Sequence, residues 1–476
     1  MKRAVALLVY LTCVNATAAR DLAGVYADAL QSDPQIRQAN ANRLASREAR
    51  PQAWAALLPQ LSGSASRQQD KQNGTQGTVN YDPVNNTFIP IPETYGLNST
   101  AKTWSLNLRQ NLFSWANWAT LKQADAQVAQ AEATYQAARQ SLILRVAQAY
   151  FNVLTAQDTL AANQAALESI ARQLDQAEQR YTAGLVAVTD VQEARSARDT
   201  AAATVIAAKR TLANAGDQLS EISGQKYAAL AEPGEDMPLR APEPADEEKW
   251  VQASLDQNVT LLSDRLAADI ARENVRIAFG GHLPTIDLLA SRSRSITDAD
   301  ESVAGSSPFT LDSAANDRQY TLQITVPLFS GGYTQSRIRQ TQYLWIAAKE
   351  QVVQSSRATE RQARDAYLGV ISGIARVGAL RQALRSSETA LKATEASYDV
   401  GTRTAVDVLN ARRILVQAQT DYAVSRYDYV VSVIQLRLAA GNLSQNDVAE
   451  VNSWLAATAA TNPPGEAAPA PPAPRS

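Results

Sequence analysis

Apolar and polar positions follow two different periods along this chain. Short segments alternate apolar with polar residues, which is the pattern of a strand with one apolar face. Much longer segments place apolar residues at steps of three and four, which is the pattern of helices that pack along a seam. The alternating apolar residues are Trp104, Leu106 and Leu108 in the first short segment and Tyr320, Leu322, Ile324 and Val326 in the second.

The helical seam predicts very long helices. In the first half it runs from Leu142 to Tyr181 with one polar position, Asn163, and in the second half it runs more loosely from Ala363 to Tyr398. A sustained 3.5-residue period predicts coiled-coil packing, in which a single asparagine can fix the register. About 64 helical residues at 1.5 Å each span roughly 96 Å, which suits a rod or a tube rather than a globular domain.

The same succession of elements is predicted twice. A Tyr-x-x-Gly motif at 181–184 returns at 398–401, and an Asp-Val pair at 190–191 returns at 407–408. An internal duplication of this length means that one structural unit is built twice. Each copy is predicted to contain an opening helix, a strand, a loop, a second strand, a long helix and a last helix. The predicted bounds are 22–56, 60–68, 69–100, 102–113, 117–180 and 188–222 in the first copy, and 247–280, 285–294, 295–317, 319–329, 335–397 and 405–439 in the second.

The two ends of the chain read as targeting and tail segments. A basic start, Met1-Lys2-Arg3, precedes a short apolar stretch and small residues, so residues 1–19 are predicted to be a signal peptide for export. Cys13, the only cysteine, lies inside this stretch, and a lipid-attachment role fits poorly because the apolar run before it is short. The Pro/Ala-rich residues 462–476 are predicted to be disordered.

Charge and hydropathy narrow the class of protein. The 45 basic and 47 acidic residues give a formal charge of −2, which argues against a nucleic-acid partner bound through a basic field. No later segment has the roughly 18 uninterrupted apolar residues of a membrane-spanning helix, so the choices are soluble helices or a β-barrel. Alternating strands fit either a soluble sandwich or a membrane barrel, and four strands per chain close a barrel only if several chains contribute.

The sequence contains few candidate catalytic, metal-binding or nucleotide-binding residues. His282 is the only histidine, no other histidine or cysteine accompanies it as a metal ligand, and no nucleophile-elbow sequence makes it part of a hydrolase triad. The chain has no phosphate loop and no dinucleotide fingerprint. We therefore expect a protein that is not an enzyme and that has no cofactor. Trp115 and Trp118 are either anchors at a membrane interface or ordinary buried residues between strand and helix.

Four segments carry a resemblance to a known family. Residues 184–195, 400–409, 149–154 and 281–285 resemble the TolC family, the outer membrane factors that form trimeric exit ducts for Gram-negative efflux pumps and type I secretion systems. The resemblance covers about 21–455. It implies a mainly α protein with a β-barrel, located in the outer membrane and extending into the periplasm. The competing class is a periplasmic coiled-coil scaffold or adaptor whose strands form a soluble domain, and a nutrient porin is a poor fit because porins lack long helices.

The resemblance implies how the chain is divided and assembled. Three chains would each contribute four strands to a twelve-stranded membrane barrel in contact with outer-membrane lipid, continuous with a twelve-helix coiled-coil tunnel. Two segments beside the repeats would form an equatorial belt around this tunnel. The implied parts are the first repeat at 20–224, the equatorial linker at 225–246, the second repeat at 247–441 and the equatorial C-terminal segment at 442–461.

Functional positions are also implied by the resemblance. Tyr398 and Arg403 would donate bonds between chains that lock the periplasmic tip, and a periplasmic adaptor with an inner-membrane RND or ABC pump would open it. Asn410 stands where the family pattern has a second acidic residue, so one ring of carboxylates is expected at the constriction. The implied roles are gate for Gln179, Thr189, Asp190, Tyr398 and Arg403, pore constriction for Asp407 and Asn410, and adaptor docking for Gly184, Leu185, Gly401 and Thr402.

Local helix chemistry offers a second explanation for the same residues. Thr189, Asp190 and Asp407 follow a glycine turn, where a short polar side chain caps the first turn of a helix. Gly184 and Gly401 stand where a left-handed residue ends a helix. The two explanations are compatible, so both stay open at this point.

Overall fold

The computed structural model describes residues 19–234, 237–303 and 307–456. The signal peptide expected at 1–19 and the tail expected at 462–476 therefore fall, except for residue 19, outside the described residues. The chain divides into two compact units, which are treated separately below. One unit comprises Ala45–Gln130 and Arg265–Glu350, and the other comprises the residues up to Leu44, Ala131–Asp264 and the residues from Gln351 onward.

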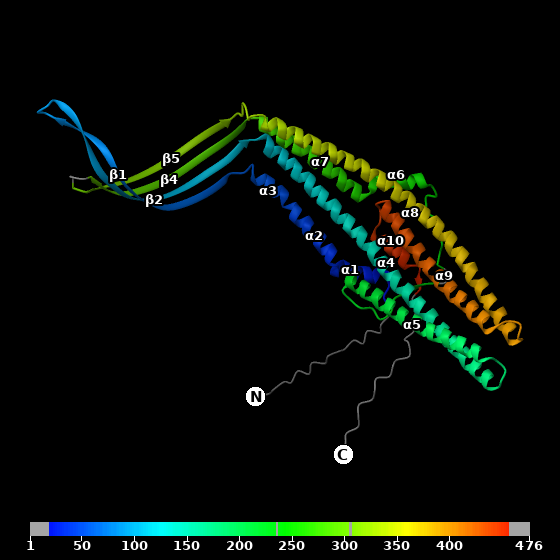
Figure 1. The fold of residues 1–476 in the computed structure, drawn as a ribbon. Coiled ribbons are helices and arrows are strands. Elements are labelled where there is room, and N and C mark those ends of the chain that lie inside the picture. The colour runs from blue at the N-terminus through cyan, green and yellow to red at the C-terminus, as the bar shows by residue number, and fades with distance from the viewer. Residues whose placement is uncertain (1–18, 235–236, 304–306, 457–476) are drawn as a thin grey trace, which may run out of the picture. The chain divides into compact units, whose positions relative to one another are not determined.

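The first of these units contains one antiparallel sheet of four strands in the order β1-β2-β4-β5. Figure 1 shows the four strands side by side as a curved sheet. Facing residues continue across all four strands, because Leu61 pairs with Leu108, Leu108 with Ala290 and Ala290 with Tyr320. Paired residues lie on the same face, so each such row belongs to one face of the sheet. The strand bounds are β1 Gln60–Asp82, β2 Thr87–Phe113, β4 Thr285–Val303 and β5 Phe309–Thr325.

The strands are much longer than the sequence pattern predicted. Segments 69–100 and 295–317 were expected as loops, and this prediction is wrong, because most of both segments is paired strand. The first hairpin closes only at residues 83–86, where Tyr81 and Phe88 face each other with ring centroids 5.4 Å apart. Polar residues occupy both faces of these outer strand portions, so the apolar alternation that signals a strand is missing although the backbone ladder continues.

The opening helix of each copy is broken into pieces. Residues 22–56 form three helices, and the first break follows from Pro34, which disfavours a helical conformation at Asp33. Residues 247–280 break at Asn258, whose side chain accepts bonds from the backbone of Thr260 and Leu261 and so starts a new helix. The bounds are α1 Leu22–Ser32, α2 Pro34–Arg47, α3 Ala49–Ala55, α6 Glu247–Gln257 and α7 Val259–Phe279, followed by the short helix η1 Gly280–His282.

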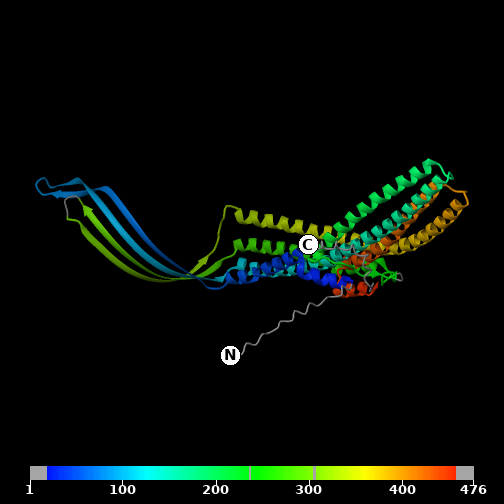
Figure 2. The ribbon, with the colours of Figure 1, turned by 90° about the horizontal axis from the view of Figure 1, so that it is seen from below.

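The long helices are confirmed within a few residues of their predicted bounds. α4 spans Trp115–Thr182 and α8 spans Tyr333–Asp399, each followed by a shorter partner, α5 Val188–Ser223 and α9 Ala405–Ala439. Figure 2 shows the two helical hairpins from a second side. Among the described helices, none is long and apolar enough to cross a membrane.

The seam residues are where the helices pack. Leu142, Val146 and Val153 of α4 are buried in the main apolar core of their unit. Asn163, the polar seam position, is half-buried and donates to the carbonyl of Thr159 one turn earlier at 2.7 Å. Its amide is therefore satisfied within its own helix.

Two segments outside the repeats pack onto the middle of this helical unit. β3 (Glu232–Pro233) pairs with β6 (Leu455–Ala456), and α10 (Gln445–Asn452) lies between the second hairpin and β6 in the chain. The buried Tyr150 hydroxyl of α4 donates to the carbonyl of Ala231 at 2.6 Å. The buried Tyr429 of α9 bonds the backbone of Arg240 in both directions, and these tyrosines attach the segment to the long hairpins.

Candidate functional site

The two turns that join the long helices to their partners have the same closing geometry. Gly184 and Gly401 have φ of 74° and 78°, which is the left-handed region that glycine adopts without a steric penalty. In each turn the residue after the glycine donates to a carbonyl in the last turn of the long helix. These bonds run from Leu185 to Arg180 and from Thr402 to Ser397, both at 2.9 Å. The prediction that both glycines end a helix is confirmed.

The start of α9 carries a reciprocal cap. The Thr404 hydroxyl accepts the Asp407 backbone N–H at 3.3 Å, and the Asp407 carboxylate accepts the Thr404 backbone N–H at 2.9 Å. The capping explanation is therefore correct for Asp407. The bonds from Thr404, with a smaller contribution from Arg403, lower the pKa of the Asp407 carboxyl below its ordinary value. These bonds therefore favour the charged form of Asp407.

The start of α5 has no such cap. The position before the helix is Ala187, which has no side chain to accept a bond, and the capping explanation is wrong for Thr189 and Asp190. Within the described residues, the side chains of Thr189 and Asp190 form no hydrogen bond or ion pair. Thr189 is exposed and Asp190 is half-buried in the single chain. Their polar atoms are thus available for contacts outside it.

The two turns of one chain meet through Arg180. Its guanidinium carbon lies 5.1 Å from the ring centroid of Tyr398, and its Nη2 lies 4.0 Å from the carboxylate of Asp399. The sequence interpretation missed Arg180 and Asp399. A basic residue in the last turn of α4 was visible in the sequence, but nothing there indicated that it would reach the other hairpin.

An ion pair joins the two helices of each hairpin at equivalent positions. Arg195 of α5 reaches Glu178 of α4 at 2.8 Å, and Arg412 of α9 pairs with Glu395 of α8. The Arg195 side chain is 52% exposed and the Arg412 side chain only 14%, so the second pair is the more shielded. These pairs were also missed, although the equal spacing of Glu and Arg in both copies was a detectable signal.

The remaining predicted gate residues have local partners only. Gln179 donates to Asp175 of the same helix at 2.9 Å, and Arg403 lies 3.8 Å from Asp407. Within one chain the described contacts bring neither Tyr398 nor Arg403 to Asp190, Thr189 or Gln179. The constriction residue Asn410 and the docking residues Gly184, Leu185, Gly401 and Thr402 are all exposed.

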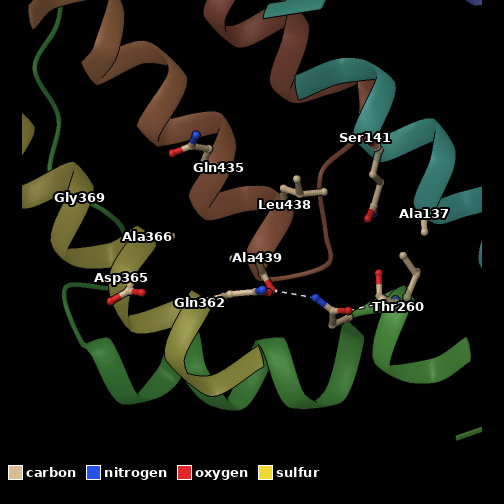
Figure 3. A pocket seen from close by; sticks show the side chains of 13 residues that line it. Ala137, Ser141, Thr260, Gln362, Asp365, Ala366, Gly369, Gln435, Leu438 and Ala439 are labelled. Atoms are coloured by element: carbon tan, nitrogen blue, oxygen red, sulfur yellow. Dashed lines mark hydrogen bonds between the residues drawn. The ribbon is translucent and has the colours of Figure 1, made fainter. Parts of the chain in front are cut away.

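A pocket between the helices of the same unit offers no catalytic group. Figure 3 shows it lined by residues of α4, α7, α8 and α9. The amide of Asn258, another lining residue, donates to the carbonyl of Ala439 at 3.3 Å. Asp365 is the one ionisable side chain in this lining, and it lies 3.6 Å from Arg361. The described residues contain no group of three or more potential metal ligands.

The other singled-out residues lie in the unit that holds the sheet. His282 is in η1, with its ring centroid 6.3 Å from that of Phe279. Trp115 donates to the carbonyl of Arg276, and Trp118 packs edge-on against Trp54. Both tryptophans remain more than 40% exposed, so burial between strand and helix is incomplete.

Comparisons with known proteins agree with one another. The family described as outer membrane efflux protein matches residues 25–225 and 250–442. The outer membrane protein TolC of Escherichia coli is 36% identical over 448 residues, which cover 94% of this chain and 87% of the relative. The alkaline protease secretion protein AprF of Pseudomonas aeruginosa is 29% identical over 422 residues, covering 88% and 84%. The crystal structure of the outer membrane protein VceC from Vibrio cholerae has a TM-score of 0.67 at 22% identity, covering 88% of this chain and 96% of that chain, which shows a shared fold.

Proposed function

Because this chain belongs to the outer membrane efflux protein family and is an outer-membrane exit duct, we propose that three copies assemble into a passive conduit from the periplasm to the outside. The alternative of a periplasmic scaffold is set aside by the family membership. The conduit carries out no reaction, and the family is one of channels rather than enzymes. Transport energy then comes from an inner-membrane pump.

The membrane part of the proposal rests on the four-stranded sheet. One face carries the row Leu61, Leu108, Ala290 and Tyr320, and the adjacent positions carry the polar row Ser62, Asn107, Ser291 and Gln319. An apolar outer face and a polar inner face are what a lipid-facing, water-filled barrel requires. The sheet ends at β1 and β5, so three copies joined at these edges give a twelve-stranded barrel without free edges.

The helical part would form the wall of a periplasmic tunnel. Each chain supplies two long helices and two stacks of shorter ones, so three chains give twelve helices around one axis. We assign residues 20–224 and 247–441 to two repeats of one unit. The segments 225–246 and 442–461, as far as they are described, would form the belt around the tunnel, held by β3 and β6.

The gate would lie at the two helical turns. Tyr398 and Arg403 would donate to Asp190, Thr189 or Gln179 of a neighbouring chain. Three observations support this: the phenol hydroxyl of Tyr398 makes no hydrogen bond within the described chain, Arg403 has only a 3.8 Å contact to Asp407, and Asp190 is unpaired there. Charge-assisted bonds of this kind are directional and individually breakable.

The constriction would carry one ring of three Asp407 carboxylates. Within one chain the bonds from Thr404 lower the pKa of this group and so favour its charged form. A ring of such carboxylates would favour cations. Asn410 would add no charge one turn further on.

Opening would depend on partners. The exposed Gly184-Leu185 and Gly401-Thr402 turns are proposed to contact a periplasmic adaptor, with an RND or ABC pump behind it. Differential contacts with the open state would shift the closed tip toward open. Similarity to a protease secretion protein supports type I secretion as one use of the duct.

Conductance in a planar lipid bilayer tests the proposal. The detergent-purified full chain is compared with an Arg403→Ser, Tyr398→Phe variant and with Arg385→Ser, an exposed control on α8. Small cation-preferring steps that grow in the double variant but not in the control are expected. Channels unchanged by the double variant would refute the gate assignment, and folded protein that never conducts would refute the conduit.

A further inference from the structure

Basic side chains gather on one face of the sheet, at a defined height. The strand pairing places Arg67 opposite Lys102, Arg294 opposite Trp104, and Arg292 opposite Arg318. Paired residues share a face, and residues two apart on a strand share it too. All five basic residues therefore lie on the face that carries Leu61, Leu108 and Tyr320. We call these five residues, Arg67, Lys102, Arg292, Arg294 and Arg318, the basic belt.

The opposite face has no such belt. The row between Arg292 and Arg294 consists of Ser64, Ser105, Ser293 and Asp317, and the next row outward consists of Ser66, Thr103, Ser295 and Ala315. Arg292 and Arg294 are exposed, whereas the serines beside them are half-buried. In these rows the basic charge thus lies on the apolar face. On the opposite face Arg109 lies nearer the other end of the sheet, where it pairs with Asp287 at 3.5 Å.

The belt follows the apolar band along the strands. On β5, Ile324, Leu322 and Tyr320 come first, and Arg318 comes next. For strands tilted by about 40°, the six residues from Ile324 to Arg318 span about 15 Å along the barrel axis. The ten residues from Ile324 to the row of Arg67 and Lys102 span about 25 Å along the same axis. An apolar band on such a barrel is about 25 Å tall. The belt therefore occupies the outer part of the band, from about 15 Å to its outer edge at about 25 Å. The long arginine side chains can extend toward that edge.

The arginines of the belt lack acidic partners in the part of the chain that the structure describes. Lys102 lies 3.3 Å from Asp298, which is in the next row outward. Within the described residues, Arg67, Arg292, Arg294 and Arg318 form no ion pair. A cluster of unpaired guanidinium groups beside apolar residues matches phosphate groups attached to acyl chains, since guanidinium binds phosphate in a bidentate way.

We propose that the basic belt binds the phosphate groups of outer-leaflet lipid. This inference rests on the proposed barrel, because the apolar face must be the lipid face. The acyl chains would cover the rows from Ile324 to Tyr320. The phosphates would contact the arginines, the first of which lie in the next row of the same face, beside Leu106. The site would fix the height of the duct in the membrane through charge as well as through hydrophobic matching.

The test compares lipid retention by the full chain and by a triple variant, Arg292→Gln, Arg294→Gln and Arg318→Gln. The matched control is Arg357→Gln, Arg381→Gln and Arg385→Gln, three exposed arginines of α8. The probes are a bis-phosphorylated lipid A and the same lipid after enzymatic dephosphorylation, measured by native mass spectrometry after detergent exchange. We expect the phosphorylated lipid to bind about tenfold more tightly or better, and the triple variant alone to lose this preference.

Three outcomes would overturn the proposal: equal binding of both lipids, full retention by the triple variant, or displacement by millimolar inorganic phosphate, which would indicate a general anion site. Conductance of the triple variant in bilayers of neutral phosphatidylcholine separates this inference from the proposed function. Wild-type protein that conducts normally but shows no preference for the phosphorylated lipid rejects only the belt. Folded wild-type protein that never conducts rejects the barrel and the belt together.

Discussion

The guanidinium of Arg180 lies over the ring of Tyr398, 5.1 Å from its centroid, and so joins the two hairpins of one chain at their turns. Tyr398 is the residue proposed to bond a neighbouring chain. Its ring is thus held from inside the chain while its hydroxyl remains available. Arg180 is in this sense a positioning residue for the gate.

Arg180→Gln is expected to raise the open fraction of the channel. A cation–π contact at an exposed site contributes about 0.5–1 kcal/mol, which corresponds to a change of about two- to fivefold. Single-channel recording measures this, with Arg172→Gln as the control, since Arg172 pairs with Glu168 of its own helix. In a Tyr398→Leu background the Arg180 change should have no further effect, and an undiminished effect there would contradict the positioning role.

Asp407→Asn is expected to reduce the cation preference of the channel. The variant removes the proposed ring of charge, while the backbone N–H of Thr404 keeps an oxygen acceptor. Reversal potentials in a salt gradient measure the preference, with Asp421→Asn of the same helix as the control. Because the pKa of Asp407 is lowered, the wild-type preference should persist as pH falls through the ordinary carboxyl range. A preference lost near pH 4, at the usual carboxyl pKa, would argue against this environment.

Tyr427→Phe is expected to destabilise the helical unit. The Tyr427 hydroxyl donates to the Asp158 carboxylate at 2.6 Å, and the ring stacks on Phe151, a contact that the variant keeps. Loss of the donor leaves a largely buried carboxylate without its partner, which costs about 1–3 kcal/mol. Thermal unfolding followed by circular dichroism measures this. Tyr367→Phe, which removes a hydroxyl with no hydrogen bond among the described residues, should be nearly neutral.

The same carboxylate predicts a pH dependence. Burial raises the pKa of Asp158, against the opposing effects of Tyr427 and Arg426, and burial and Asp158 together raise the pKa of the nearby Glu232. Between the ordinary and the raised pKa the folded chain binds a proton that the unfolded chain does not. Asp158 therefore lowers stability as pH rises through that window. The stability of Asp158→Asn minus that of wild type should grow as pH rises above about 4, the ordinary carboxyl pKa, and a constant difference would refute this.

Two alanine substitutions at left-handed glycines should differ sharply in cost. A Cβ at Gly184 would meet nothing within 4 Å, whereas a Cβ at Gly441 would lie 2.4 Å from the carbonyl oxygen of Gln257. Gly184→Ala then pays only for the left-handed backbone, about 1–2 kcal/mol, and Gly441→Ala adds a backbone clash for a total of about 2–5 kcal/mol. Thermal unfolding of both variants checks the order, and equal costs would contradict it.

The sequence predicted the parts of the fold in which side-chain pattern and burial agree. The seam of α4 and α8 is such a part, since apolar residues at helical spacing are the ones that pack. The pattern failed at 69–100, where backbone pairing continues between strands that lack a regular alternation of apolar and polar side chains. It also failed to break the opening helices, although Pro34 and Asn258 carried the local signals for a break.

The residues of the candidate site also fall into those that the sequence predicted and those that it did not. Gly184, Gly401 and Asp407 were predictable because turn and cap chemistry is local in sequence. Arg180 and Asp399 were not, because their contact joins two hairpins whose relative placement no local pattern encodes. Ala187 shows how a single residue decides a local outcome, since the repeat places it where Thr404 stands in the other copy.

This difference between Ala187 and Thr404 makes the two turns mechanically unequal. The first turn of α9 is held by two reciprocal bonds, whereas the first turn of α5 has no side-chain cap. Helix ends without caps fray more readily. In a ring of three chains, loosely and firmly held turns would alternate around the circumference. Such a pore would widen mainly at the turns between α4 and α5, while the more firmly held turns between α8 and α9 would stay in place.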